Sequence, residues 1–105
     1  MKKFEQIDIE EAKKMMAEND FLIVDIRDPE AYKETHIKDA VSLSDDNVDH
    51  FLKSADKKRP LLCYCYHGIS SQQAAQFFAH AGFEKVYSLI GGFEQWRQSA
   101  PIVSD

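Results

Sequence analysis

The chain has 105 residues, of which 44% are hydrophobic and 30% charged, a composition typical of globular proteins and too apolar for a disordered chain. Its formal net charge of −5 at pH 7 offers no basic surface for nucleic acid or an anionic membrane, so we expect neither as a partner. A chain of this length is expected to form one domain, over residues 1–105. We expect it in the cytoplasm, because the sequence holds neither the apolar core of a signal peptide nor a run of transmembrane length.

Helices and strands are expected to alternate along the chain. Asp8 and Glu11 are spaced as a capping pair that opens a helix, and the apolar run 21–24 predicts a strand buried on both faces. Asp28-Pro29 opens a short second helix, because proline at the first helical position loses nothing by lacking its N–H. The expected elements are helix 9–18, strand 21–24, helix 29–35, strand 40–43, helix 45–55, strand 61–65, helix 70–81, strand 85–89 and helix 93–99.

The apolar run that starts at Leu61 ends in Cys65, and a compact loop leads from there into the helix over 70–81. A thiol at the carboxyl end of a buried strand, just before a helix, faces backbone N–H groups and the positive end of the helix dipole, and both favour the thiolate. Gly68 permits a backbone conformation closed to other residues, so successive N–H groups can turn inward and form an anion-binding concavity. Cys65 is therefore a candidate nucleophile.

Two serines stand where this helix is expected to begin. Ser70 and Ser71 are interpreted first as helix caps, and a hydrogen bond from a hydroxyl to the sulfur is a secondary use of the same atoms. Gly82 is the expected stop signal. The residues expected on the inner face of this helix are Ala74, Phe77, Phe78 and Ala81.

The alternation of strands and helices implies parallel pairing with right-handed crossovers, and therefore an α/β fold with helices on both faces of a sheet. Such sheets bind ligands beyond the carboxyl ends of their strands. Cys65 is expected at that rim, and so is Arg27, which follows the strand over 21–24. Asp25 and Arg27 are expected to form an ion pair that fixes the rim, since a guanidinium matches a carboxylate fork.

Cys63 lies inside its strand, which favours a packing role, with a resolving or second redox role left as the alternative. We expect no disulfide between Cys63 and Cys65, because side chains two residues apart on a strand point the same way without meeting. These two cysteines and His67 are also not expected to bind metal, because alternate residues on one strand are poor tetrahedral ligands. His67 is left open between proton handling, leaving-group binding and a bystander role.

Taken together, these residues resemble the rhodanese family, and within it the small single-domain thiosulfate sulfurtransferases. The resemblance implies a three-layer α/β/α fold with a central, mostly parallel sheet of about five strands. The matching segments run in order over nearly the whole chain, and they are Val24-Asp25-Ile26-Arg27-Asp28-Pro29, His36-Ile37, Cys65-Tyr66-His67-Gly68 with Ser70-Ser71, and Val86-Tyr87-Ser88 through Gly91-Gly92-Phe93-Glu94 to Trp96.

The resemblance further implies a ping-pong sulfur transfer without a cofactor. The Cys65 thiolate attacks the outer sulfur of thiosulfate, sulfite leaves, and a cyanide, a small thiol or a protein thiol such as thioredoxin takes the sulfur from the persulfide. The residues expected to bind substrate are Tyr66, His67, Gly68, Ile69 and Ser70, with Arg27 and Ser71 supporting the site. Ile69 departs from the family pattern, which has a polar residue there.

Two other functions compete with this interpretation. A cysteine phosphatase or arsenate reductase needs an arginine six residues after its cysteine to clamp an oxyanion, and that position is Ser71. A persulfide carrier that receives sulfur from a partner protein, or a non-catalytic regulatory module, is the alternative from another class. The presence of Cys65 argues against the inert module but does not separate the carrier from the thiosulfate enzyme.

Overall fold

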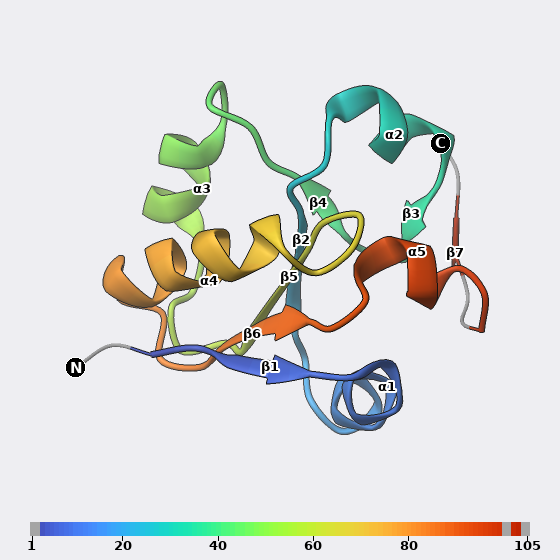
Figure 1. Ribbon diagram of the computed structural model, residues 1–105. Coiled ribbons are helices and arrows are strands. Elements are labelled where there is room, and N and C mark those ends of the chain that lie inside the picture. The colour runs from blue at the N-terminus through green and yellow to red at the C-terminus, as the bar shows by residue number, and fades with distance from the viewer. Residues whose placement is uncertain (1–2, 100–101, 104–105) are drawn as a thin grey trace.

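A computed structural model describes residues 3–99 and 102–103, so the predicted domain range 1–105 extends beyond the described residues at both ends. The elements are β1 (Glu5–Ile7), α1 (Ile9–Glu18), β2 (Leu22–Asp25), α2 (Pro29–Glu34), β3 (His36–Ile37), β4 (Val41–Ser42), α3 (Val48–Ser54), β5 (Leu61–Tyr64), α4 (Ser70–His80), β6 (Val86–Leu89), α5 (Gly92–Trp96) and β7 (Ile102–Val103). Figure 1 shows them around a central sheet.

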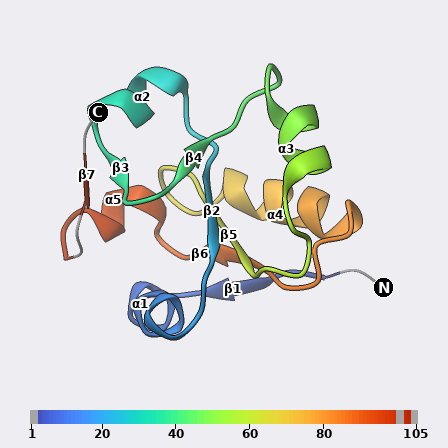
Figure 2. The same ribbon diagram turned by 180° about the vertical axis from the view of Figure 1, so that it is seen from behind.

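The central sheet has five strands in the order β1-β6-β5-β2-β4, and every neighbouring pair is parallel. The strand β5 therefore lies in the middle, with all four of its side chains buried. On one face, α1 and α5 pack over a core that includes Ala12, Leu62 and Trp96. On the other face, α3 and α4 pack over a second core around Phe51 and Phe78. The two views in Figures 1 and 2 show the helices on opposite sides of the sheet, so the predicted three-layer α/β/α fold is confirmed.

The local signals placed most elements correctly. The helix α1 covers the predicted range, and the Asp8 side chain accepts a hydrogen bond from the Glu11 amide at its start. The helix α2 begins at Pro29 with Asp28 as its cap, as predicted. None of the helices in the described ranges has both the length and the apolar character needed to cross a bilayer.

Three short strands were not predicted. The edge strand β1 has three residues, of which only Ile7 is buried, so it shows no apolar run. The strands β3 and β7 have two residues each and form an antiparallel pair outside the main sheet. The expectation that the strand over 85–89 is the last one was therefore wrong, because pairs this short are selected by tertiary contacts rather than by a local pattern.

The helix α3 is shorter than the predicted 45–55, because residues 45–47 form a turn. The Asn47 side chain holds that turn, accepting from the Ser44 amide and donating to the Ser42 carbonyl.

The predicted inner face of α4 also needs a correction. Phe77 lies on the outer side of α4, 48% exposed, whereas Ser71 is fully buried on its inner side.

Candidate active site

Cys65 is the first residue after β5, at the carboxyl edge of the central strand. Its Sγ accepts hydrogen bonds from the backbone amides of Gly68 and Ser71, both at 3.2 Å. The Ser71 hydroxyl oxygen lies 3.4 Å from the same sulfur. Since the Ser71 amide belongs to the first turn of α4, the sulfur lies at the positive end of that helix. The structure thus brings together the sulfur and the inward-facing amides that the sequence suggests.

The predicted caps of α4 were wrong. The residue at the cap position is Ile69, and no side chain caps the helix there. Ser70 is exposed, and the Ser71 hydroxyl is directed instead to Cys65 and to Ser88 in β6. The first turn of α4 therefore leaves the Ser71 amide for the sulfur, which takes the place that a capping oxygen has in an ordinary helix.

The loop carbonyls are held outward by α5. The amide of Phe93 donates to the Cys65 carbonyl at 2.8 Å, and the amide of Glu94 donates to the Tyr66 carbonyl at 3.0 Å. Gly92 makes this approach possible, because a Cβ there would lie 2.6 Å from the carbonyl oxygens of Cys65 and Tyr66. With these carbonyls bound to α5, the amides that follow in the loop turn toward the sulfur.

Gly68 lies at the tightest point of the loop. Its φ is +87°, and a Cβ would come within 2.9 Å of the Leu89 carbonyl oxygen and the Gly91 amide nitrogen. Its carbonyl accepts a hydrogen bond from the Gln72 side chain at 2.8 Å, and its amide faces Cys65. The prediction that a glycine conformation shapes this cradle agrees with the geometry, and the packing adds a steric reason for glycine.

The two thiols have opposite ionisation tendencies. Burial raises the pKa of the Cys65 thiol, but hydrogen bonds from the Ser71 hydroxyl and from the loop amides outweigh burial, so the pKa is lowered from its ordinary value. Burial dominates at Cys63, two residues earlier, and raises its pKa. Cys63 is fully buried with its Sγ against the carbonyl oxygens of Ser71 and Tyr87. Both cysteines are free, as expected.

We expect Cys65 alone to react with iodoacetamide near neutral pH in the folded protein, because its thiolate is favoured and Cys63 is sealed in the core. Intact-mass analysis is expected to show one adduct, which peptide mapping places on Cys65, and a second adduct only after denaturation. Equal labelling of the two cysteines in the native protein would contradict the assignment of the reactive thiol.

A pocket of about 260 Å³ opens above the sulfur, lined by Cys65, Tyr66, His67, Ile69 and Ser70. Cys65 is 6% exposed, whereas the Ile69 side chain projects outward, 74% exposed. His67 lies on the exposed wall, and its role stays a prediction. Among the described residues, Arg27 and Ser71 are not part of the pocket lining, so any support that they give to the site is indirect and stays a prediction.

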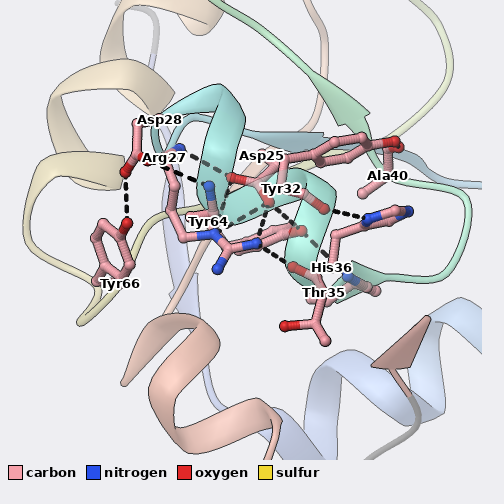
Figure 3. Close-up of polar contacts among 11 residues, drawn as sticks. Asp25, Arg27, Asp28, Tyr32, Thr35, His36, Ala40, Tyr64 and Tyr66 are labelled. Atoms are coloured by element: carbon pink, nitrogen blue, oxygen red, sulfur yellow. Dashed lines mark hydrogen bonds and ion pairs between the residues drawn. The ribbon is translucent and has the colours of Figure 1, made fainter. Parts of the chain in front are cut away.

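Arg27 lies at the same rim but is committed to a buried network, shown in Figure 3. Its guanidinium forms an ion pair with Asp25 at 2.7 Å and donates to the Thr35 carbonyl. The Tyr64 hydroxyl also donates to Asp25 and accepts from the Ile37 amide, so the buried carboxylate is fully partnered. The ion pair between Asp25 and Arg27 that the sequence predicts is present. Tyr64 belongs to the same hydrogen-bond network, and the sequence did not indicate that.

Tyr66 connects the cysteine loop to α2. Its hydroxyl donates to the Asp28 carboxylate (Figure 3), which also caps α2 by accepting from the Ala31 amide. The hydrogen bond from Tyr66 holds the pKa of the Asp28 carboxyl below its usual range. The Arg27 guanidinium lies over the rings of Phe93, at 4.0 Å, and Tyr66, at 5.5 Å. The ring of Tyr66 thus forms one wall of the pocket while its hydroxyl is held at the base of α2.

Within residues 3–99 and 102–103, no group of three His, Cys, Asp or Glu side chains is arranged to hold a metal ion.

Gly92 and Ser88 are two residues that contribute to the site and that sequence reasoning missed. The Gly91-Gly92-Phe93 turn was a visible signal for the first. Ser88 lies in one of the matching segments, but nothing in that strand pattern indicates a contact with the distant cysteine loop.

Comparisons with known proteins place this arrangement in a family. The model of the rhodanese-like domain matches residues 8–99. The thiosulfate sulfurtransferase GlpE of Coxiella burnetii is 46% identical over 98 residues, which are 93% of this chain and 92% of that protein. The protein of the same name from Vibrio cholerae is 45% identical over 103 residues, or 97% of each chain.

A solved structure agrees with these sequence matches. The crystal structure of the Alr3790 protein from Anabaena sp. superimposes with a TM-score of 0.83 at 28% identity, covering 93% of this chain and 80% of that one. The rhodanese-like model spans most of the chain, and the two GlpE proteins align with nearly all of it. The chain therefore belongs to the family of rhodanese-like domains.

Proposed function

We propose that this protein is a thiosulfate sulfurtransferase that moves the outer sulfur of thiosulfate to a thiol or cyanide through a persulfide on Cys65. The observation that carries the proposal is the cradle around Sγ, where two backbone amides at 3.2 Å and a hydroxyl at 3.4 Å favour an anionic sulfur beneath an open pocket. The GlpE relatives, named as thiosulfate sulfurtransferases, support the choice of donor.

The transfer proceeds in two displacements. In the first, the Cys65 thiolate attacks the outer sulfur of thiosulfate, a sulfur–sulfur bond forms to Sγ, and the bond within thiosulfate breaks as sulfite leaves with the electron pair. In the second, an acceptor thiolate or cyanide attacks the outer sulfur of the persulfide, and Cys65 departs as a thiolate. The amides of Gly68 and Ser71 stabilise the anionic sulfur at the start and at the end of this cycle.

The site residues have distinct roles in this proposal. Cys65 is the nucleophile, and the loop amides supply hydrogen bonds to negative charge. Tyr66, His67, Ile69 and Ser70 form the walls through which donor and acceptor enter. No cofactor takes part. The donor is a small anion, and a protein thiol such as thioredoxin is one acceptor of suitable chemistry.

Intact-mass analysis after incubation with thiosulfate tests the proposal. We expect the wild-type protein to gain one sulfur atom, which cyanide removes, and Cys65→Ser to gain none. A protein that takes no sulfur from thiosulfate but accepts it from a sulfur-donor protein is a persulfide carrier. A protein that takes sulfur from neither source is a binding module, and either result overturns the proposed donor.

The phosphatase alternative finds no support in the pocket. Ser71 occupies the position where an oxyanion-clamping arginine is needed, and among the described residues no lysine or arginine lines the pocket. The nearby Arg27 has its guanidinium bound to Asp25 and turned into the core. Hydrolysis of an aryl phosphate that depends on Cys65 would reverse this ranking.

A further inference from the structure

A second hydroxyl lies behind the one that contacts the sulfur. The Ser88 Oγ, in β6, is 2.8 Å from the Ser71 Oγ, which in turn is 3.4 Å from the Cys65 Sγ. Ser71 is fully buried and Ser88 is 1% exposed. The three side chains therefore form a row that leads from the pocket floor into the core between α4 and the sheet and that ends at Ser88.

The direction of the hydrogen bonds along this row follows from a count of protons. A thiolate has no proton to give, so the one proton of the Ser71 hydroxyl is donated to the sulfur. The Ser71 oxygen is then free to accept, and the Ser88 hydroxyl donates to it. Among the described residues, Ser71 is the hydrogen-bond partner of the Ser88 side chain, so this direction satisfies both buried hydroxyls.

The opposite direction leaves a buried proton without an acceptor. If a neutral Cys65 thiol donated its S–H to Ser71, then Ser71 would donate to Ser88, and the Ser88 proton would have no acceptor in the described part of the structure. A buried donor without an acceptor is unfavourable. A neutral thiol satisfies the row only as a weak acceptor of the Ser71 proton, whereas a thiolate accepts that proton in a stronger, charge-assisted hydrogen bond. This preference for the anion adds to that of the two backbone amides.

Ser88 also decides where the Ser71 hydroxyl points. A serine can rotate its hydroxyl toward a backbone carbonyl three or four residues earlier, and such a carbonyl competes with the sulfur for the proton. A donor at 2.8 Å from behind occupies the oxygen of Ser71 and leaves its proton directed at Cys65.

We propose that Ser88 is a positioning residue that acts through Ser71 to favour the anionic state of Cys65. Its effect on sulfur transfer rests on the proposed function, but its effect on the thiol does not. The proposal can therefore be tested without thiosulfate.

The test is the pH dependence of Cys65 alkylation by iodoacetamide in Ser88→Ala. We expect the apparent pKa of the Cys65 thiol to rise by about 0.5 to 1 unit, so that alkylation below the wild-type pKa slows roughly 3- to 10-fold. At high pH, where the thiol is ionised in both proteins, the two rates are expected to agree within about twofold.

A double-mutant cycle separates positioning from a structural role. Because Ser88 acts through Ser71, the pKa in Ser71→Ala/Ser88→Ala is expected to equal that in Ser71→Ala alone. Cys63→Ala is the matched control, since it deletes another buried side chain that contacts Ser71 but leaves the row of hydroxyls intact, and it is expected not to move the pKa. Additive shifts, or an unchanged pKa in Ser88→Ala, would overturn the proposal.

The two proposals can fail separately. If the wild-type protein gains no sulfur from thiosulfate but Ser88→Ala still raises the thiol pKa, the proposed donor is wrong and the positioning role stands. If the persulfide forms and the pKa does not move, the proposed function stands and Ser88 is a packing residue.

Discussion

Cys65→Ser is expected to lower the rate of sulfur transfer from thiosulfate to cyanide by about 10³-fold or more, measured as steady-state thiocyanate formation. The serine oxygen occupies nearly the same position, with the amides of Gly68 and Ser71 still facing it. It stays protonated near neutral pH and cannot form a persulfide, so the first displacement is lost. The thermal midpoint is expected to change by only a few degrees, because the shape of the side chain is kept.

The neighbouring cysteine provides the control. Cys63→Ala is expected to retain activity within a few-fold of wild type while losing some stability, because Cys63 is a fully buried packing residue. The pair of variants thus separates the chemistry from the packing of the same strand. Comparable loss of turnover in both variants would show that Cys65 has no unique chemical role.

Gly92→Ala is expected to destabilise the protein by about 3 to 5 kcal/mol, because it combines backbone strain with overpacking. Its φ is +59°, and the new methyl group would lie 2.6 Å from backbone atoms of Cys65 and Tyr66, which cannot move aside as a flexible side chain can. Relief of this contact must push the loop carbonyls away from α5 and turn the amides from the sulfur. We therefore expect a lower thermal midpoint together with a higher pKa of the Cys65 thiol in the folded fraction.

Gly82→Ala is the matched control for this substitution. Gly82 also has a positive φ, +111°, but the nearest atom to its Cβ would be the Lys57 Cδ, at 3.3 Å, in a side chain that can move. A loss of about 1 to 2 kcal/mol from strain alone is expected, with the pH profile of Cys65 alkylation unchanged. If Gly82→Ala proved as damaging as Gly92→Ala in both measurements, the contact between α5 and the cysteine loop would not be the cause.

The parts of the site that lie close together in sequence were predictable. Cys65 and Gly68 are neighbours in one strand–loop–helix unit, so their geometry follows from local rules about parallel sheets and helix dipoles. The same holds for Asp28 and Pro29, which start α2 as a cap and a first-turn proline do.

The parts that depend on distant segments were not predictable. Ser71 has the residue type of a helix cap, but its hydroxyl contacts Ser88, a residue of β6 whose register places it opposite Cys63 in the sheet beneath α4. Phe77 fits the apolar spacing of α4, yet it lies on the outer face because Ser71, Ala75, Phe78 and Ala79 take the inner one. Local propensity is a weak guide where tertiary contacts choose among several acceptable positions.

The pairing of Arg27 with Asp25 has a consequence for how a charged donor is captured. The Arg27 guanidinium at the rim is neutralised by Asp25 within the core, and the chain as a whole is negative, with a formal charge of −5. Long-range attraction therefore gives thiosulfate no help in its approach, and capture depends on main-chain dipoles that act over a few ångströms. Dissolved salt screens the long-range repulsion between the negative chain and the anion far more than it weakens such short contacts, so uptake of the anion is expected to rise slightly with ionic strength rather than fall.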